Sequence, residues 1–329
     1  MKISYNWLKE YIDVDLPAEQ VAEMLTFCGL EVEAIETFES IKGGLNGLVV
    51  GEVITKDKHP DADKLSLTTV NVGTENLLQI VCGAPNVEAG QKVIVALVGA
   101  KLYPITGEPF EIKKSKIRGA VSEGMICAED EIGLGQSHDG IMILPTDTKV
   151  GTPAAAFFKV EKDIVFEIGL TPNRVDAASH LGVARDLAAV MAIKLGRDIS
   201  IKLPELIEIK AQHNDFNVTV EVLDTNACAR YSGICISNIA ILDPPDWIKN
   251  RLKAIGLKPI NNIVDITNYV LHETGQPLHA FDASAISGNK IVVKKPITSE
   301  KFVTLDGVER NISTNDLMIC NANEGMCIA

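Results

Sequence analysis

Residues 48–98 read LVVGEVITKDKHPDADKLSLTTVNVGTENLLQIVCGAPNVEAGQKVIVALV and decide the fold of the central part of the chain. Short runs rich in β-branched residues alternate here with Gly, Pro and Asn, a pattern typical of short strands joined by turns. A further run follows, and Ile141–Leu144 is expected to complete the sheet. Together they predict a small closed barrel of the OB type. The predicted strands are Leu48–Ile54, Leu65–Val72, Leu77–Val81, Val93–Val98 and Phe110–Ile117.

The two segments that flank the barrel, residues 1–40 and 155–200, are predicted to be mainly helical. Apolar residues recur at helical spacing between Val21 and Cys28, and a second apolar stripe ends at Leu195. Neither segment is long enough to hold its own core. We therefore expect them to pack together as one small helical domain into which the barrel, residues 41–154, is inserted.

The last part of the chain is predicted to be an α+β domain. A connector is expected at 201–212, and residues 213–329 then alternate strands with helices. A final predicted strand runs to Ala329 without a turn or cap, so we interpret this domain as truncated. The fold class is thus multi-domain α+β. The strands predicted in the last domain are Val218–Val222, Ile234–Ile236, Leu317–Cys320 and Met326–Ala329, and its helices span 245–255 and 262–274.

The charge balance limits the ligands that the chain can hold. It has 31 Lys and Arg against 44 Asp and Glu, a net charge of −13. This argues against a general nucleic-acid coat protein, and no role on DNA is expected. One basic cluster stands out, KKSKIR at 113–118. On a strand, Lys114, Lys116 and Arg118 would share one face at about 7 Å spacing, suited to a nucleic-acid backbone, although a solvated strand face is the alternative.

The cysteines and histidines predict no metal site. The seven cysteines contain no CxxC pair, which indicates neither a zinc site nor a disulfide framework and favours a reducing compartment, the cytoplasm. No signal peptide or membrane-spanning stretch is present in the sequence, and no membrane partner is expected. His59 beside Asp61 and Asp63 could suggest a metal, but a hydrogen-bonded loop is the favoured alternative.

Three barrel motifs, HPDADKL (59–65), VCGAPNV (81–87) and KKSKIRGAVSEGM (113–125), resemble the tRNA-binding OB module. This module is found in several aminoacyl-tRNA synthetases and in free-standing tRNA-binding proteins. The resemblance implies a set of tRNA-binding residues in these motifs. They are Lys113, Lys114, Lys116, Arg118, Ser122, Met125 and Asn86.

The rest of the chain resembles the β subunit of bacterial phenylalanyl-tRNA synthetase. The motifs are MKISYNWLKEYI (1–12), TPNR (171–174) with HLGVAR (180–185), and KPINNIVDITNYVLHETGQPLHAFD (258–282). Only AAS at 177–179 departs from the family pattern. The resemblance implies an α2β2 heterotetramer with an α subunit, tRNA(Phe) as a partner, and hydrolytic editing of Tyr-tRNA(Phe). Editing is expected on general grounds, because an apolar pocket cannot strongly reject an added hydroxyl.

ATP and Mg²⁺ are expected to serve the full enzyme through the α subunit. This sequence contains no class II signature or phosphate-binding loop, so it is predicted to bind neither cofactor and to hold no metal. Alone, it is expected to be inactive in both charging and editing.

A partial editing pocket is expected around the helix 262–274. The resemblance implies that His279 orients the water or the terminal ribose, and that Thr267 and Asn268 hydrogen-bond the aminoacyl ester. A packed histidine and ordinary helix-surface residues are the alternatives. Asp265 is expected off the apolar face of this helix, or paired with Lys258.

Two other functions remain open. A free-standing tRNA-binding or chaperone protein could be built on the same OB module, although it would not need the motif at 258–282. Alternatively, the barrel could be purely architectural, contacting the α subunit or nothing.

Overall fold

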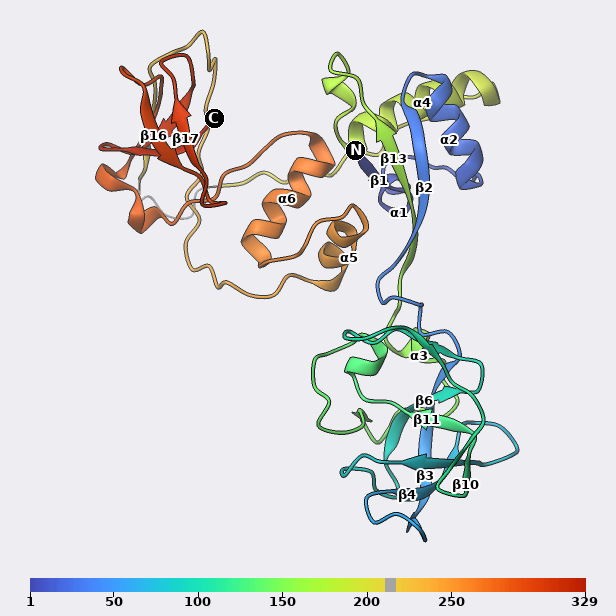
Figure 1. Cartoon of the computed structure of the whole chain (residues 1–329). Coiled ribbons are helices and arrows are strands. Elements are labelled where there is room, and N and C mark those ends of the chain that lie inside the picture. The colour runs from blue at the N-terminus through green and yellow to red at the C-terminus, as the bar shows by residue number, and fades with distance from the viewer. Residues whose placement is uncertain (211–216) are drawn as a thin grey trace. The chain divides into compact units, whose positions relative to one another are not determined.

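The computed structural model describes residues 1–210 and 217–329, and Figure 1 shows the chain. It divides into two compact units, residues 1–201 with 246–258, and residues 202–245 with 259–329. Within the predicted connector, residues 202–210 form no helix or strand. Its last two residues, and residues 213–216 of the predicted last domain, lie outside the described residues. No helix in the described part of the chain is long and apolar enough to cross a membrane.

The two segments that flank the barrel share a three-stranded antiparallel sheet. Strand β13 (Lys162–Gly169) lies in the middle, between β1 (Lys2–Ser4) and β2 (Glu31–Glu39). The prediction of a mainly helical domain did not include this sheet. Four of the nine residues of β2 are Glu, which has low strand propensity, so the pairing with β13 decides its conformation. The helices of this unit outside the barrel are α1 (Tyr5–Leu8), α2 (Ala18–Phe27), α4 (His180–Leu195), α5 (Asp246–Ala254) and the 3₁₀ turn Val175–Ala177.

The central strands form a nearly closed barrel, which is consistent with an OB-like fold. Their order is β11-β6-β3-β4-β5, and β12 also pairs with β6. The ends of this sheet approach each other, because Glu123 N–H donates to the carbonyl of Gln79 at 2.8 Å. The first four predicted strands form, with β3 four residues longer than expected. The bounds are β3 (Leu48–Lys58), β4 (Ser66–Asn71), β5 (Leu78–Cys82), β6 (Lys92–Leu97), β11 (Gly124–Ile126) and β12 (Ile143–Leu144).

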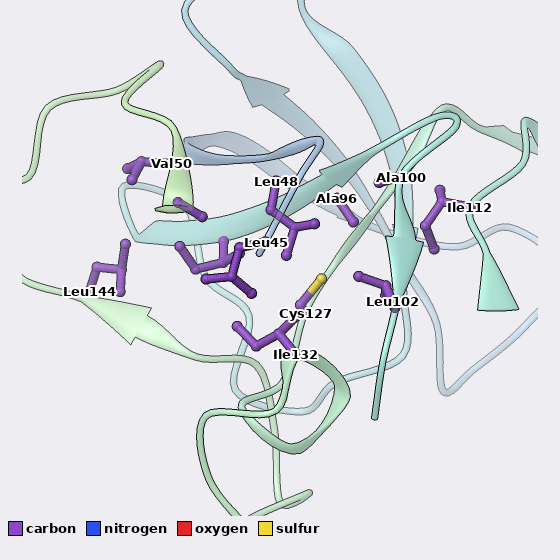
Figure 2. Packing of buried hydrophobic residues seen from close by; sticks show 12 residues of the cluster. Leu45, Leu48, Val50, Ala96, Ala100, Leu102, Ile112, Cys127, Ile132 and Leu144 are labelled. Atoms are coloured by element: carbon purple, nitrogen blue, oxygen red, sulfur yellow. The ribbon is translucent and has the colours of Figure 1, made fainter. Parts of the chain in front are cut away.

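Strand β6 is buried on both faces, which explains its uninterrupted apolar sequence. Val93 and Val95 pack into the core that contains Val53 and Ile80. Ile94 and Ala96, the alternate residues of β6, pack into a second cluster, which Figure 2 shows. Leu102, the 3₁₀ turn Asp130–Ile132 and the helix α3 (Ala154–Phe157) also contribute buried side chains to this cluster. The barrel thus rests on two apolar clusters that share one strand.

The fifth predicted strand, Phe110–Ile117, is wrong as a single element. The chain leaves the sheet at Ile112, whose N–H donates to the carbonyl of Ala100 at 2.8 Å and whose side chain is buried in the second cluster. Two separate hairpins result, one on each side of this anchor. They pair β7 (Lys101–Leu102) with β8 (Phe110–Glu111), and β9 (Ser115–Ile117) with β10 (Ala120–Ser122).

The second unit contains a four-stranded sheet of order β14-β15-β18-β19, in which β14 and β15 are parallel. The helix α6 (Asn262–Thr274) has the predicted bounds. The predicted strand Ile234–Ile236 does not form, and the two isoleucines are 66% and 68% exposed. The other elements are β14 (Thr219–Val222), β15 (Lys290–Lys294), β18 (Met318–Cys320), β19 (Gly325–Ile328), the hairpin β16 (Glu300–Val303) and β17 (Glu309–Ile312), and the 3₁₀ turns Ala283–Ala285 and Ser287–Asn289.

Candidate functional site

The basic cluster runs into the β9–β10 hairpin of the barrel, with Lys113 and Lys114 just before β9. Ile117 pairs with Ala120, so Arg118 and Gly119 form a two-residue turn, with φ of 48° and 90°. Positive φ at both turn positions is typical of the type I′ turns that join twisted strands. The prediction that Lys114, Lys116 and Arg118 share one strand face is therefore wrong, because Lys114 precedes the strand and the chain reverses at Arg118.

The hairpin nevertheless concentrates positive charge on the surface. Lys113, Lys116 and Arg118 are exposed, and none of them forms an ion pair with a carboxylate in the described residues. Lys114 Nζ lies 2.7 Å from Glu123 Oε1, and this contact holds the pKa of the Glu123 carboxyl below its usual range. Because both side chains are partly exposed, the pair contributes little to stability.

His59 joins the HPDADKL loop to the basic hairpin. Its side chain is 2% exposed. The N–H of Asp61 donates to Nδ1 at 3.1 Å, so Nε2 carries the proton and donates to the carbonyl of Ile117 at 3.2 Å. Both ring nitrogens are thus engaged within the barrel. This supports the hydrogen-bonded loop over a metal ligand.

The other residues predicted to contact tRNA serve the barrel itself. Asn86 forms two hydrogen bonds with the backbone of Ile141, both of 2.9 Å. The buried Ser122 hydroxyl accepts from Val81 N–H at 3.1 Å and donates to the carbonyl of Gly124 at 3.0 Å. Met125 packs against the second apolar cluster. Because these side chains are used internally, only the four basic residues remain candidates for tRNA contact.

In the second unit, α6 begins and ends as its sequence predicts. The Asn261 side chain accepts from two N–H groups of the first turn at 3.0 Å, and Gly275 ends the helix with φ of 82°. Asp265 is fully buried, and its carboxylate accepts from Ile260 N–H at 3.0 and 3.1 Å. It is therefore neither off the buried face nor paired with Lys258 as expected. The carboxylate instead stabilises the turn that precedes the helix.

The three predicted editing residues occupy two different elements. Thr267, on α6, donates its hydroxyl to the carbonyl of Val264 at 2.7 Å, and the next residue, Asn268, is half-buried. His279 lies beyond the helix, where its Nδ1 is 3.4 Å from Sγ of Cys327 on β19. In the described residues no hydrogen bond joins His279 to either α6 residue. The structure thus places the parts of the predicted pocket without assembling them.

The contact between Cys327 and His279 defines the state of both side chains. Burial raises the pKa of the Cys327 thiol to about 11, so it is protonated near neutral pH and can donate to Nδ1. A neutral ring that accepts this bond at Nδ1 carries its hydrogen on Nε2, and His279 is exposed.

A buried polar cluster in the first unit was missed by sequence reasoning. The Ser4 hydroxyl donates to Asp163 Oδ2 at 2.5 Å and accepts from Trp7 N–H at 3.0 Å. The Trp7 ring stacks on His180, with ring centroids 3.8 Å apart. The motifs MKISYNWLKEYI and HLGVAR meet at this cluster, so both have a structural role. The Ser4–Trp7 spacing of an N-cap is the one local signal that could have predicted it.

Comparison with known proteins matches two family models to the chain. A tRNA-binding domain model, tRNA_bind, covers residues 48–153, and the B3/4 domain model covers residues 227–329. The basic hairpin lies within the first model. All three candidate editing residues lie within the second.

Curated relatives match over the whole chain. The phenylalanine–tRNA ligase β subunits of Bacteroides fragilis and Porphyromonas gingivalis are 52% and 54% identical to it over 329 and 330 residues. This chain spans 40% of the length of each. A solved structure, the C-terminal domain of Plasmodium vivax p43, is 26% identical and covers 32% of this chain and 56% of that chain, with a TM-score of 0.23. Along its whole length, the chain therefore matches the phenylalanine–tRNA ligase β subunits, of which it corresponds to a part.

Proposed function

We propose that this chain is the part of a β subunit that binds tRNA(Phe) and carries half of a site for editing Tyr-tRNA(Phe). The observation that carries the first role is the β9–β10 hairpin, which presents Lys113, Lys116 and Arg118 without carboxylate partners in the described residues. These cations belong to a chain of net charge −13, so a polyanion can bind only at such a local patch.

The wider reaction is assigned to the complete enzyme. In the cytoplasm, an α2β2 assembly would charge tRNA(Phe) with phenylalanine, and the α subunit would use ATP and Mg²⁺. The chain described here would bind neither cofactor and would be inactive alone in charging and editing. The family membership supports this division of labour.

The editing role is supported by the chemistry around His279. Ester hydrolysis at the 3′ end of tRNA needs a positioned water and donors for the developing oxyanion. The thiol of Cys327 occupies Nδ1 of His279, which leaves the Nε2 proton to orient a water or the terminal ribose. Thr267 and Asn268 would supply hydrogen bonds to the ester once α6 and β19 border the same pocket.

His279→Ala in the complete β chain, co-expressed with its α partner, tests this role. We expect deacylation of Tyr-tRNA(Phe) to slow by about a hundredfold, the usual contribution of a general acid–base group, while phenylalanine charging is retained. His138→Ala is the matched control, because that exposed histidine lies in the barrel. Unchanged deacylation in His279→Ala would remove this residue from the editing site.

A binding experiment on the chain itself distinguishes a tRNA-binding barrel from a purely architectural one. Lys116→Ala and Arg118→Ala should weaken tRNA(Phe) binding if the hairpin contacts the phosphate backbone. If both variants bind tRNA with the affinity and the salt dependence of the wild-type chain, the barrel does not bind tRNA through this hairpin. The free-standing tRNA-binding protein is disfavoured, because the match to β subunits covers residues far beyond the OB module.

A further inference from the structure

A groove opens on the barrel next to the HPDADKL loop. Its volume is about 440 Å³, and its walls come from the end of β3, from residues 63–66 and from residues 83–85. It lies outside the hairpin described above, and none of the predicted tRNA-binding residues lines it. Three lysines, Lys56, Lys58 and Lys64, border it together with two aspartates.

Two of the three lysines of the groove, Lys58 and Lys64, can meet an anion. Lys58 pairs with Asp63 at 2.7 Å, but the two side chains are 71% and 92% exposed, so the pair contributes little and can be exchanged. Lys64 is exposed and forms no ion pair within the described residues. Lys56 is held against Glu88 at 2.6 Å, which fixes its position at the edge of the groove.

The remaining wall of the groove is apolar and open. Leu65, Ala84 and Pro85 contribute this wall. Gly83 also lines the groove, and a Cβ added there would meet only Cδ2 of Leu65, at an ordinary contact distance of 3.4 Å. An apolar wall beside exposed cations suits a flat, uncharged ring attached to a backbone that has a phosphate on either side.

The groove and the basic hairpin border the same loop. His59, at the start of this loop, is hydrogen-bonded to Ile117 of the hairpin, and the Cβ position of Gly119 lies 3.9 Å from Oδ2 of Asp61. Lys64 and Leu65, at the other end of the loop, line the groove. A polyanionic chain that lies on the hairpin can therefore continue into the groove.

We propose that the groove binds one unpaired nucleotide of RNA, with its base against Leu65 and Pro85 and its flanking phosphates on Lys58 and Lys64. The volume lies within the range of pockets that enclose small organic ligands. A duplex is excluded, because stacked and paired bases cannot enter a pocket, whereas an unstacked base can. This inference rests on the proposed tRNA-binding function and adds single-stranded RNA as the feature that the barrel recognises.

Fluorescence anisotropy with the chain of residues 1–329 and a dye-labelled octauridylate tests the groove directly. Lys64→Ala should weaken binding about fivefold by removal of a cation that meets a phosphate, and Gly83→Leu should weaken it at least as much by filling the groove. Lys149→Ala is the matched control, an exposed lysine of the same barrel that does not line the groove, and it should bind as the wild type does. Gly83→Ala, which fits beside Leu65, separates filling from misfolding and should retain binding. A blunt RNA duplex with the same total number of phosphates should not displace the octauridylate.

A tRNA(Phe) transcript measured in parallel separates the two proposals. The groove proposal is overturned if Lys64→Ala and Gly83→Leu bind octauridylate with wild-type affinity, or if the blunt duplex displaces octauridylate. If groove variants bind octauridylate weakly but the wild-type chain does not bind tRNA(Phe), the groove stands and the tRNA-binding function fails. If the chain binds tRNA(Phe) through the hairpin with no effect of groove variants on either ligand, only the groove fails.

Discussion

The backbone N–H of Ser4 donates to Nε2 of His180 at 3.1 Å, across 176 residues of sequence. The bond joins the end of β1 to the first residue of α4, and both residues are fully buried. Asp163, on the central strand, completes the connection through the Ser4 hydroxyl and the N–H of Asn6 at 2.9 Å. Residues before and after the barrel are thus held together by polar groups as well as by the sheet.

Loss of the His180 acceptor should destabilise the first unit. His180→Phe retains a ring to stack on Trp7 but leaves the Ser4 N–H unsatisfied in a buried position, at a cost of about 1–3 kcal/mol in the free energy of unfolding. Urea denaturation of the chain measures this. His138→Phe, at an exposed histidine that loses only its surface pair with Asp130, is the control and should change stability by less than about 1 kcal/mol. Equal stability of the two variants would contradict a structural role for His180.

The first turn of α4 allows no side chain at Gly182. A Cβ there would lie 2.2 Å from the carbonyl oxygen of Asp176 and 2.7 Å from Cα of Ala177. Because both are backbone atoms, Gly182→Ala must displace the 3₁₀ turn and should cost about 1–3 kcal/mol of stability. Gly83→Ala, whose Cβ meets no atom closer than 3.4 Å, is the matched control in thermal unfolding. A Gly182→Ala protein as stable as this control would show that the turn can move freely.

The cations of the hairpin should dominate the salt dependence of tRNA binding. If Lys116 and Arg118 each neutralise one phosphate, Lys116→Ala or Arg118→Ala should lower the slope of log K against log salt by about 0.7–0.9. Filter binding of tRNA(Phe) at several salt concentrations measures the slope. Lys149→Ala, with the same change in net charge, should leave it unchanged. A slope that falls equally in all three variants would point to net charge and not to direct phosphate binding.

His59 should act on tRNA binding through the position of the hairpin. His59→Ala removes the bonds to Asp61 and Ile117 but none of the exposed cations, so affinity should fall several-fold with the salt slope retained. Amide hydrogen exchange of residues 115–122 should accelerate in the same variant, because the hairpin loses its attachment to the loop. Unchanged exchange together with unchanged affinity would exclude this positioning role.

Thiol alkylation should follow pH differently at Cys327 and Cys235. With a pKa of about 11, only about one Cys327 in a thousand is a thiolate at pH 8, so iodoacetamide should modify the exposed Cys235 first. The pKa is raised and not lowered because burial disfavours the charged thiolate form of Cys327. Modification of Cys327 should rise about tenfold per pH unit between pH 8 and 10, as read by mass spectrometry of the native chain. Equal rates for the two thiols at pH 8 would contradict the buried environment of Cys327.

Local patterns predicted the elements whose conformation depends on nearby residues. The helix α6, with its Asn261 cap and Gly275 end, and the first four strands of the barrel follow from spacing and turn residues. The motifs around the basic hairpin and His279 indicated the family correctly. The failed predictions involve distant partners. Residues 234–236 have a strand-like sequence but remain unpaired, and β2 has a strand-poor sequence but pairs with β13.

The sequence by itself determined the family, the barrel and the residue types available for binding, because these depend on motifs and short-range periodicity. Only the tertiary structure decided where those residues lie. The anchor at Ile112 divides the predicted strand Phe110–Ile117, the chain reverses at Arg118, and backbone groups of Ile141 engage the side chain of Asn86. Such contacts join residues far apart in the chain, and their geometry depends on which buried polar groups must find partners, which no local pattern contains.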